Sequence, residues 1–254
     1  MKGSLRMDLH IHTCLSPCGA PENVPTRIVQ KALEKRLDVI GICDHNSSEN
    51  VQAVRLAAGR AASEKLHVWG GMEITTREEV HLLAIFADGD SLARMQETVY
   101  DSLPGVNDRE FFGEQYIVDE EDYVIGTNEH LLIGATTMSV DETIGHVHRL
   151  GGVAVACHID REAFSVISQL GFVPENAGFD ALEVSPNHAS SPFDLSPYLE
   201  GSTGGSPVVA FSDAHRLAEI GRAFTRFRMP RPGLDGLKDA LAGAGERNVA
   251  PVFA

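Results

Sequence analysis

The chain has 254 residues, of which 43% are hydrophobic, so it is long enough for one sizeable core and fits a single α/β barrel. The formal net charge of −15 argues against general electrostatic binding of DNA or RNA, because such binding needs clustered lysine and arginine side chains. The longest apolar runs are too short to cross a bilayer, so no membrane segment is expected.

The first predicted strand is the segment Met-Asp-Leu-His-Ile-His near the N-terminus. Side chains alternate along a strand, so we expect Asp8, His10 and His12 on one face and Leu9 and Ile11 on the other. Ser-Pro and Cys-Gly follow, and both pairs favour turns. The two histidines are therefore expected at the C-terminal end of the strand, where α/β proteins carry their chemistry.

Apolar periodicity predicts alternating helices and strands after this segment. In chain order we expect a helix at 26–37, a strand that starts at 38, a helix at 50–63 and extended segments at 66–76 and 79–86. This alternation is typical of parallel strands joined by crossover helices.

The segment 88–138 interrupts this alternation. It contains a predicted helix at 90–103 and a predicted hairpin that pairs 115–118 with 123–125 around an acidic turn. We interpret the segment as an insertion or lid within a single domain that spans 1–254.

Strands and helices alternate again after residue 138. Ser139 and Glu142 have the spacing of a capping box, which predicts the start of a helix at 139–150. The remaining predicted elements are strands at 151–158, 180–185, 207–213 and 222–227 and helices at 162–170 and 234–241.

Histidine and carboxylate side chains recur at the ends of the predicted strands. Five separate strands or strand ends deliver them: His10 and His12, Asp44 and His45, Glu73 with His81, His158, and Asp213 with His215. Buried charged groups are costly unless they are paired or bound to metal, so this recurrence predicts a multinuclear metal site. Nitrogen and oxygen ligands of this kind suit Zn²⁺, Mn²⁺ or Fe²⁺ better than Ca²⁺ or Mg²⁺.

The order of these motifs resembles the PHP family, named for polymerase and histidinol phosphatase. The motifs are Asp-Leu-His-Ile-His-Thr, Cys-Asp-His-Asn, Gly-Met-Glu, the strand histidine His158 and Ser-Asp-Ala-His. The resemblance implies a distorted (β/α)₇ TIM-like barrel that holds two to three divalent metal ions and hydrolyses phosphoesters.

The resemblance also implies a ligand set. His10, His12, Glu73 and Asp213 would hold the first metal, and Glu73 would bridge to a second metal held by His81 and His158. A third metal would be held by His45 and His215. Asp8 and Asp44 are expected behind the ligands, where Asp8 would orient an imidazole.

Cys18 departs from the family pattern, because many members carry a third-metal histidine at this place. A deprotonated cysteine can hold Zn²⁺ but matches Mn²⁺ poorly, so a role for Cys18 in the third site stays open. Cys157 precedes His158 on the same strand, so we expect it to point the opposite way, as a core thiol. The cysteines form no paired framework and the N-terminus has no apolar signal segment, which favours reduced thiols and a cytoplasmic location.

The implied reaction is hydrolysis of small phosphomonoesters or nucleotide phosphodiesters by a metal-bridging hydroxide. Glu73 and Asp213 are its expected catalytic carboxylates, and Arg161 and Arg216 would neutralise phosphate oxygens. The expected partner is a small phosphorylated substrate, without general nucleic-acid or membrane binding, and the oligomeric state is left open. Two alternatives remain: a catalytically weak module that binds metal or a phosphorylated ligand, and a metal-dependent amidohydrolase.

Overall fold

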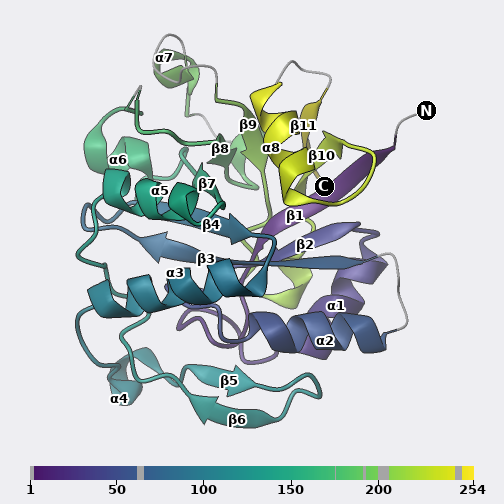
Figure 1. Ribbon diagram of the computed structural model, residues 1–254, viewed down its shortest axis with the longest axis vertical. Coiled ribbons are helices and arrows are strands. Elements are labelled where there is room, and N and C mark those ends of the chain that lie inside the picture. Colours follow the sequence, from purple (N-terminus) through teal and green to yellow (C-terminus); the bar gives the residue numbers. More distant parts are fainter. Residues whose placement is uncertain (1–2, 62–65, 175, 191–192, 200–205, 244–247) are drawn as a thin grey trace.

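The computed structural model describes residues 3–61, 66–174, 176–190, 193–199, 206–243 and 248–254. A nine-stranded sheet runs in the order β11-β10-β1-β2-β3-β4-β7-β8-β9. Because β9 lies against both β10 and β11, the sheet curls into a nearly closed barrel (Figure 1). Its strands are β1 (Ser4–Ile11), β2 (Val39–Ile42), β3 (His67–Thr75), β4 (His81–Phe86), β7 (Val153–Ala156), β8 (Ala181–Val184), β9 (Val208–Ala210), β10 (Ala223–Arg228) and β11 (Val249–Phe253).

Two strands of the sheet, β4 and β10, run opposite to the others. β1, β2 and β3 are parallel, and so are β7, β8 and β9, but β4 is antiparallel to both β3 and β7. The expectation of parallel strands throughout was therefore wrong at β4, because the short link from β3 cannot make a crossover. β10 is antiparallel to β1 and to β11, and the sequence did not predict β11.

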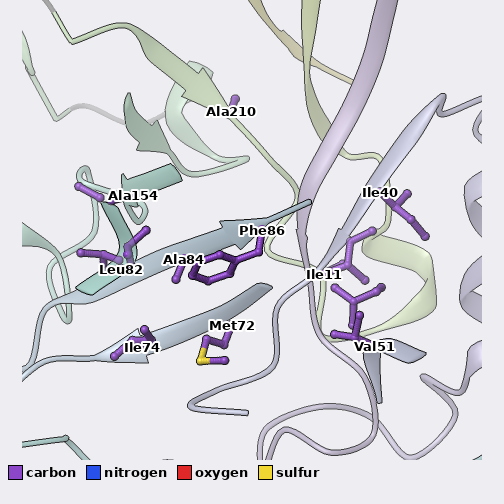
Figure 2. Packing of buried hydrophobic residues seen from close by; sticks show 14 of the residues in the cluster. Ile11, Ile40, Val51, Met72, Ile74, Leu82, Ala84, Phe86, Ala154 and Ala210 are labelled. Atoms are coloured by element: carbon purple, nitrogen blue, oxygen red, sulfur yellow. The ribbon is translucent and has the colours of Figure 1, made fainter. Parts of the chain in front are cut away.

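Helices cover the outside of the barrel. The outer apolar cluster combines strand residues with buried side chains of α1 (Pro25–Glu34), α2 (Val51–Arg60), α3 (Gly89–Ser102), α5 (Val140–Arg149) and α6 (Val166–Leu170). Figure 2 shows Val51 of α2 near Ile11 and Ile40, with Met72 and Phe86 from neighbouring strands. The α/β barrel expected from the sequence is thus confirmed.

A second apolar cluster fills the inside of the barrel. It draws on every strand of the sheet and on α8 (Leu234–Ala242), whose Leu237 and Leu241 lie against Leu9, Val153 and Phe227. Val153 opens its strand, so α8 lies at the end of the barrel from which the parallel strands start. The opposite end, where the parallel strands finish, is left for polar side chains.

The segment 88–138 contributes α3, α4 (Arg109–Phe112) and a two-stranded hairpin of β5 (Tyr116–Val118) and β6 (Val124–Thr127). In Figure 1 the hairpin lies beyond α2 and α3, outside the barrel. Asn50 attaches it, because the Asn50 amide donates to the Tyr116 carbonyl at 3.1 Å and accepts from the Val118 N–H at 3.0 Å.

Two local predictions can be compared directly with the structure. The capping box of Ser139 and Glu142 is confirmed at the start of α5. The helix expected at 162–170 is shorter, because Ser165 caps it and Val166 is its first residue. None of the helices in the described ranges has the length and apolarity needed to cross a membrane.

Candidate metal centre

The end of β1 brings two histidines to the mouth of the barrel. The register between β1 and β2 shifts between Asp8 and Ile11. Leu9 consequently packs in the inner cluster, whereas Ile11 packs in the outer one. The strict alternation expected from the sequence was wrong here, because the irregularity adds a residue to one strand. The rings of His10 and His12 face each other with their Nε2 atoms 3.2 Å apart.

Two further site residues follow strands in an unusual backbone conformation. His158 has a φ of 29° and Asp213 a φ of 46°, in the left-handed region that non-glycine residues rarely adopt. Such conformations carry strain that the surrounding fold must hold in place, and they concentrate at functional sites. At these two positions the strained backbone turns an imidazole and a carboxylate toward the mouth of the barrel.

Glu73, near the end of β3, lies at the centre of the histidines. Its Oε1 is 2.8 Å from His81 Nδ1 and 3.1 Å from His158 Nε2. Its Oε2 faces a second set of nitrogens, those of His45 at 3.1 Å, His12 at 3.3 Å and His10 at 3.5 Å. One carboxylate therefore contacts five imidazoles with its two oxygens.

The ligand-bearing side chains fall into overlapping groups whose potential ligand atoms lie within 4.8 Å of one another. One group is His10, His12, Glu73 and Asp213, another is His45, Glu73 and His81, and a third is His12, His45 and His215. His158 joins Glu73 and Cys157 in a further group. The fold thus gathers every histidine and carboxylate that the sequence proposed as a metal ligand.

The donor atoms of this cluster fit a metal ion. Glu73 is 1% exposed, yet its Oε2 makes no hydrogen bond within the described part of the chain, and neither does His45 Nδ1. A buried carboxylate oxygen without a hydrogen bond is costly, and a divalent cation among these nitrogens would remove that cost. The buried His, Glu and Asp cluster therefore points to metal ions.

The electrostatics of the cluster favour a protonated His10 beside the ionised carboxylates of Glu73 and Asp213. Burial alone would lower the pKa of His10, but Glu183, Asp213 and Glu73 raise it well above its ordinary value. Burial opposes the charge of Glu73 as well, but the surrounding imidazoles, led by His81, hold its pKa well below its usual range. Asp213 is likewise held ionised, mainly by His10. A divalent cation would take the place of the protons on these imidazoles.

Two hydrogen-bonded carboxylates orient the β1 histidines. Both oxygens of Glu183 lie 3.0 Å from His10 Nδ1, so that nitrogen donates and Nε2 is left facing the centre. Asp44 acts on His12 through Ser16: Ser16 Oγ donates to Asp44 at 2.7 Å and accepts from His12 Nδ1 at 2.9 Å. Asp44 was expected behind the ligands, whereas Glu183 was missed although it is the acid of an apolar strand.

Asp8 has different partners from those expected. Its carboxylate accepts from the backbone N–H groups of Ser212 and Gly221, each at 2.9 Å, and contacts no imidazole by hydrogen bond in the described residues. Burial raises the pKa of Asp8 to about 6. Asp8 therefore links β1 to the loop that carries Asp213, and Glu183 takes the position beside His10.

The cysteines near the centre differ in their surroundings. Cys18 is exposed and belongs to none of the ligand groups found among the described residues. Cys157 is fully buried in the inner cluster, but its Sγ lies within 4.8 Å of ligand atoms of Glu73 and His158. The expectation that it points away from His158 was wrong, because the positive φ of His158 breaks the alternation. Burial keeps the pKa of the Cys157 thiol well above its ordinary value.

A pocket of about 460 Å³ opens beside the cluster. It is lined by His81, His158, Asp160, Arg161, Phe164 and Ser185, among others. The Arg161 guanidinium lies 2.5 Å from Asp213 Oδ2 and is partly exposed. The Arg216 side chain is 74% exposed, lies 3.9 Å from Glu219 and does not line this pocket. The two arginines proposed from the sequence thus lie in different surroundings.

Comparison with known proteins identifies the architecture. A family model described as PHP-associated matches residues 203–244. The lesion-specific endonuclease Endonuclease Q from Pyrococcus furiosus has a TM-score of 0.66 at 17% identity, over 97% of this chain and 58% of that one. A two-domain protein from Bacteroides vulgatus, which contains a predicted PHP-like metal-dependent phosphoesterase, has a TM-score of 0.56 at 17% identity, over 99% and 65%. The chain has the PHP fold.

The family resemblance seen in the sequence motifs is thereby confirmed. No curated protein sequence is similar enough to count as a relative. The chain spans less than three fifths of the length of Endonuclease Q. The likeness therefore applies to only part of each of these proteins.

One expectation about partners is overturned. Endonuclease Q has also been solved in complex with a 27-mer duplex substrate that carries an abasic lesion at the active site, with a TM-score of 0.63 at 16% identity, over 96% of this chain and 57% of that one. A fold similar to that of this chain is thus compatible with nucleic-acid binding, and excluding such binding from the net charge was wrong. Net charge sums the whole surface, whereas a nucleic acid meets a local patch and the charges of the site itself.

Proposed function

We propose that this protein is a metal-dependent hydrolase of phosphoester bonds. The observation that carries the proposal is Glu73, a buried carboxylate within 3.5 Å of nitrogen atoms from five imidazoles. Such a carboxylate can bridge two cations, and paired cations are a recurrent device for phosphoester hydrolysis. The PHP fold and its phosphoesterase and endonuclease neighbours support the same reaction class.

The proposed ligand assignment follows the groups of neighbouring donor atoms. His10, His12, Glu73 and Asp213 would hold one ion, and Glu73, His81 and His158 a second. His45 and His215 would hold a third ion beside His12, with Cys18 left out because it belongs to none of the ligand groups found among the described residues. The nitrogen-rich donor set favours Zn²⁺, Mn²⁺ or Fe²⁺.

The chain's own residues have distinct tasks in this proposal. When bound, divalent ions supply Lewis acidity toward phosphoryl oxygens. Arg161 offers a permanent positive charge at the pocket wall, and its contact with Asp213 orients it toward the centre. Asp213, held ionised by its neighbours, accepts hydrogen bonds from the attacking water and from Arg161. A second phosphate contact by Arg216, which lies outside the pocket, stays a prediction.

The proposed substrates are small phosphomonoesters and nucleotide phosphodiesters. Short nucleic acids contain the same phosphodiester bond as nucleotide diesters, and the duplex bound to Endonuclease Q supports including them. An amidohydrolase is less well supported, because the sequence has no lysine at the C-terminal end of a predicted strand that could be carboxylated to bridge two ions. A catalytically weak binding module is the remaining alternative.

The test is a phosphoester screen with purified protein supplied with Mn²⁺, Zn²⁺ or Fe²⁺. We expect ion-dependent release of phosphate, or cleavage of a nucleotide diester or strand, that Glu73→Gln lowers by about a thousandfold, in line with the loss of a group essential to the reaction centre. Circular dichroism should show the same fold for this variant. Full activity of Glu73→Gln, or ion binding without turnover of any phosphoester, would contradict the proposal.

A further inference from the structure

Phe164 is an exposed aromatic side chain beside the candidate metal centre. Its side chain is 42% exposed, and it lines the same pocket as His81, His158 and Arg161. Its ring lies almost parallel to that of His81, with the centroids 4.7 Å apart and an interplanar angle of 16°. One face of the phenyl ring is therefore occupied by His81, while part of the side chain remains open to solvent and to a ligand.

The backbone holds this ring in place at an energetic cost. Phe164 has a φ of 57°, which is rare for a bulky side chain. The conformation is held by the Phe164 carbonyl, which accepts from the His81 N–H at 2.9 Å, and by Ser165, whose hydroxyl donates to the Arg161 carbonyl at 2.7 Å. A strained, exposed aromatic residue fixed at a pocket wall suggests a contact with a ligand.

The same short loop carries a cation and an aromatic ring. The Arg161 N–H donates to the His158 carbonyl at 2.9 Å, so the loop begins at a candidate metal ligand and ends at Phe164. Arg161 would meet a phosphate oxygen, and Phe164 would meet a flat group attached to that phosphate. The pocket volume of about 460 Å³ is within the range of small-ligand sites.

We propose that Phe164 is the stacking surface for a nucleobase and that the substrate of this site is therefore a nucleotide. The proposal rests on the proposed function, because it places the base next to the scissile phosphate. Phenylalanine stacks on every base with little regard to its identity. Phe164 would therefore select nucleotides over other phosphoesters without selecting one base.

The test compares a substrate with a base and one without. Phe164→Leu keeps an apolar side chain but removes the ring, and Phe164→Tyr restores a ring. We expect Phe164→Leu to raise KM for adenosine 5′-monophosphate by about 5- to 150-fold, the range that base stacking gives by substitution, and to leave KM for glycerol phosphate unchanged. Phe164→Tyr should behave like the wild type. Phe172→Leu is the matched control, because Phe172 is 56% exposed and does not line the pocket.

A short single-stranded oligonucleotide in the same assay separates a free nucleotide from a strand end. If Phe164→Leu raises KM more for the oligonucleotide than for adenosine 5′-monophosphate, the ring contacts a strand. If the two increases are equal, the ring contacts the terminal nucleotide alone. Equal losses for both phosphomonoesters, or no loss for either, would overturn the role of Phe164 and leave the phosphoesterase proposal standing.

Failure of the phosphoesterase itself has a different signature. If no phosphoester is hydrolysed, isothermal titration of adenosine 5′-monophosphate into the ion-supplied variants decides the question. If adenosine 5′-monophosphate binds more weakly to Phe164→Leu than to Phe172→Leu, Phe164 is a stacking surface although the protein does not hydrolyse phosphoesters. Equal binding to the two variants would overturn the stacking surface as well.

Discussion

Glu183 illustrates how a residue outside the proposed ligand set can orient a member of that set. Both of its oxygens accept from His10 Nδ1, and this contact sets which nitrogen of His10 faces the centre. We predict that Glu183→Gln weakens ion binding about 10- to 100-fold, the usual effect of losing a carboxylate behind a ligand histidine. Competition with a chromogenic chelator measures this affinity.

The control for this substitution is Glu34→Gln, which changes an exposed carboxylate on α1 that pairs with Lys31. Equal ion affinity of Glu183→Gln and Glu34→Gln would show that Glu183 does not orient His10. Far-ultraviolet circular dichroism checks that both variants fold.

Protons should compete with metal ions at the β1 histidines. Burial alone would lower the pKa of His12, but contacts with Asp213 and Glu73 raise it from 6.5 to about 9. Without ions, His12 is therefore protonated at pH 7, and its charge stabilises the fold fully below pH 6.5 and progressively less as the pH rises through about 9.

The prediction is that ion affinity rises with pH between about 6.5 and 9, by up to tenfold per pH unit for each proton released. Titration calorimetry in buffers of different ionisation enthalpy counts these protons. An affinity that is flat over this range would mean that the imidazoles are already deprotonated in the ion-free chain.

The motifs predicted which histidines and carboxylates meet at the candidate centre, because each motif places a histidine or acid at a strand end. That these residues bind metal stays a prediction. They failed for Asp8 and Cys157, because a register shift and a positive φ reversed the side-chain alternation on which those expectations depended. The partnership of Glu183 with His10 joins residues 173 positions apart, and only the closed sheet brings them together.

At the scale of elements, β2 pairs with β1 so closely at position 41 that a side chain there would meet the β1 backbone. A Cβ added to Gly41 would lie 2.5 Å from the Leu9 carbonyl oxygen. Because Leu9 precedes His10, we predict that Gly41→Ala lowers the free energy of unfolding by about 1–3 kcal/mol, as overpacking does, and also weakens ion binding.

Denaturant unfolding and chelator competition measure the two effects. Gly59→Ala is the matched control, because position 59 lies on α2 with no heavy atom within 4 Å of an added Cβ. It should raise stability by about 0.5–1 kcal/mol, since alanine favours the helix. Unchanged unfolding of Gly41→Ala would show that β1 and β2 can separate without cost.

Periodicity predicted most helices because each has one apolar face, and most strands because they are short runs of buried apolar residues. It could not predict that β4 runs antiparallel, since the direction of a strand depends on the link before it. It also missed β11, which completes the sheet by pairing with β10. The segment 88–138 departs from the barrel pattern in sequence, and we propose that it is an insertion or lid whose hairpin is attached through Asn50.

At the scale of the molecule, the centre joins strands from both halves of the chain. Ions that bind the folded state alone should therefore stabilise the whole barrel. At a free ion concentration a hundred times Kd the gain is about 2.7 kcal/mol. For a chain of this size that corresponds to roughly 5–10 °C in Tm.

We predict a fall of this size in Tm when a chelator removes the ions, measured by scanning calorimetry. Glu73→Gln should show a smaller fall, because it binds ions less tightly at the start. A Tm that does not change with chelator would show that the cluster is held together without cations.

The sequence predicted the α/β barrel architecture, but its net charge did not predict which classes of partner are possible. Net charge could not exclude nucleic acid because it averages over the whole surface, whereas recognition depends on groups that meet at one place. We propose that Arg161 and Phe164, which line one pocket, are such groups. Composition cannot report where such groups meet.

The position of Glu73 couples the binding of one metal ion to the binding of the next. Its two oxygens face separate sets of imidazoles, so an ion that draws on one oxygen changes the affinity of the other oxygen for its own ion. By thermodynamic reciprocity each ion must alter the binding of its neighbour by the same factor. Occupancy should therefore be cooperative or anticooperative, and a single dissociation constant will not describe the loading of this protein.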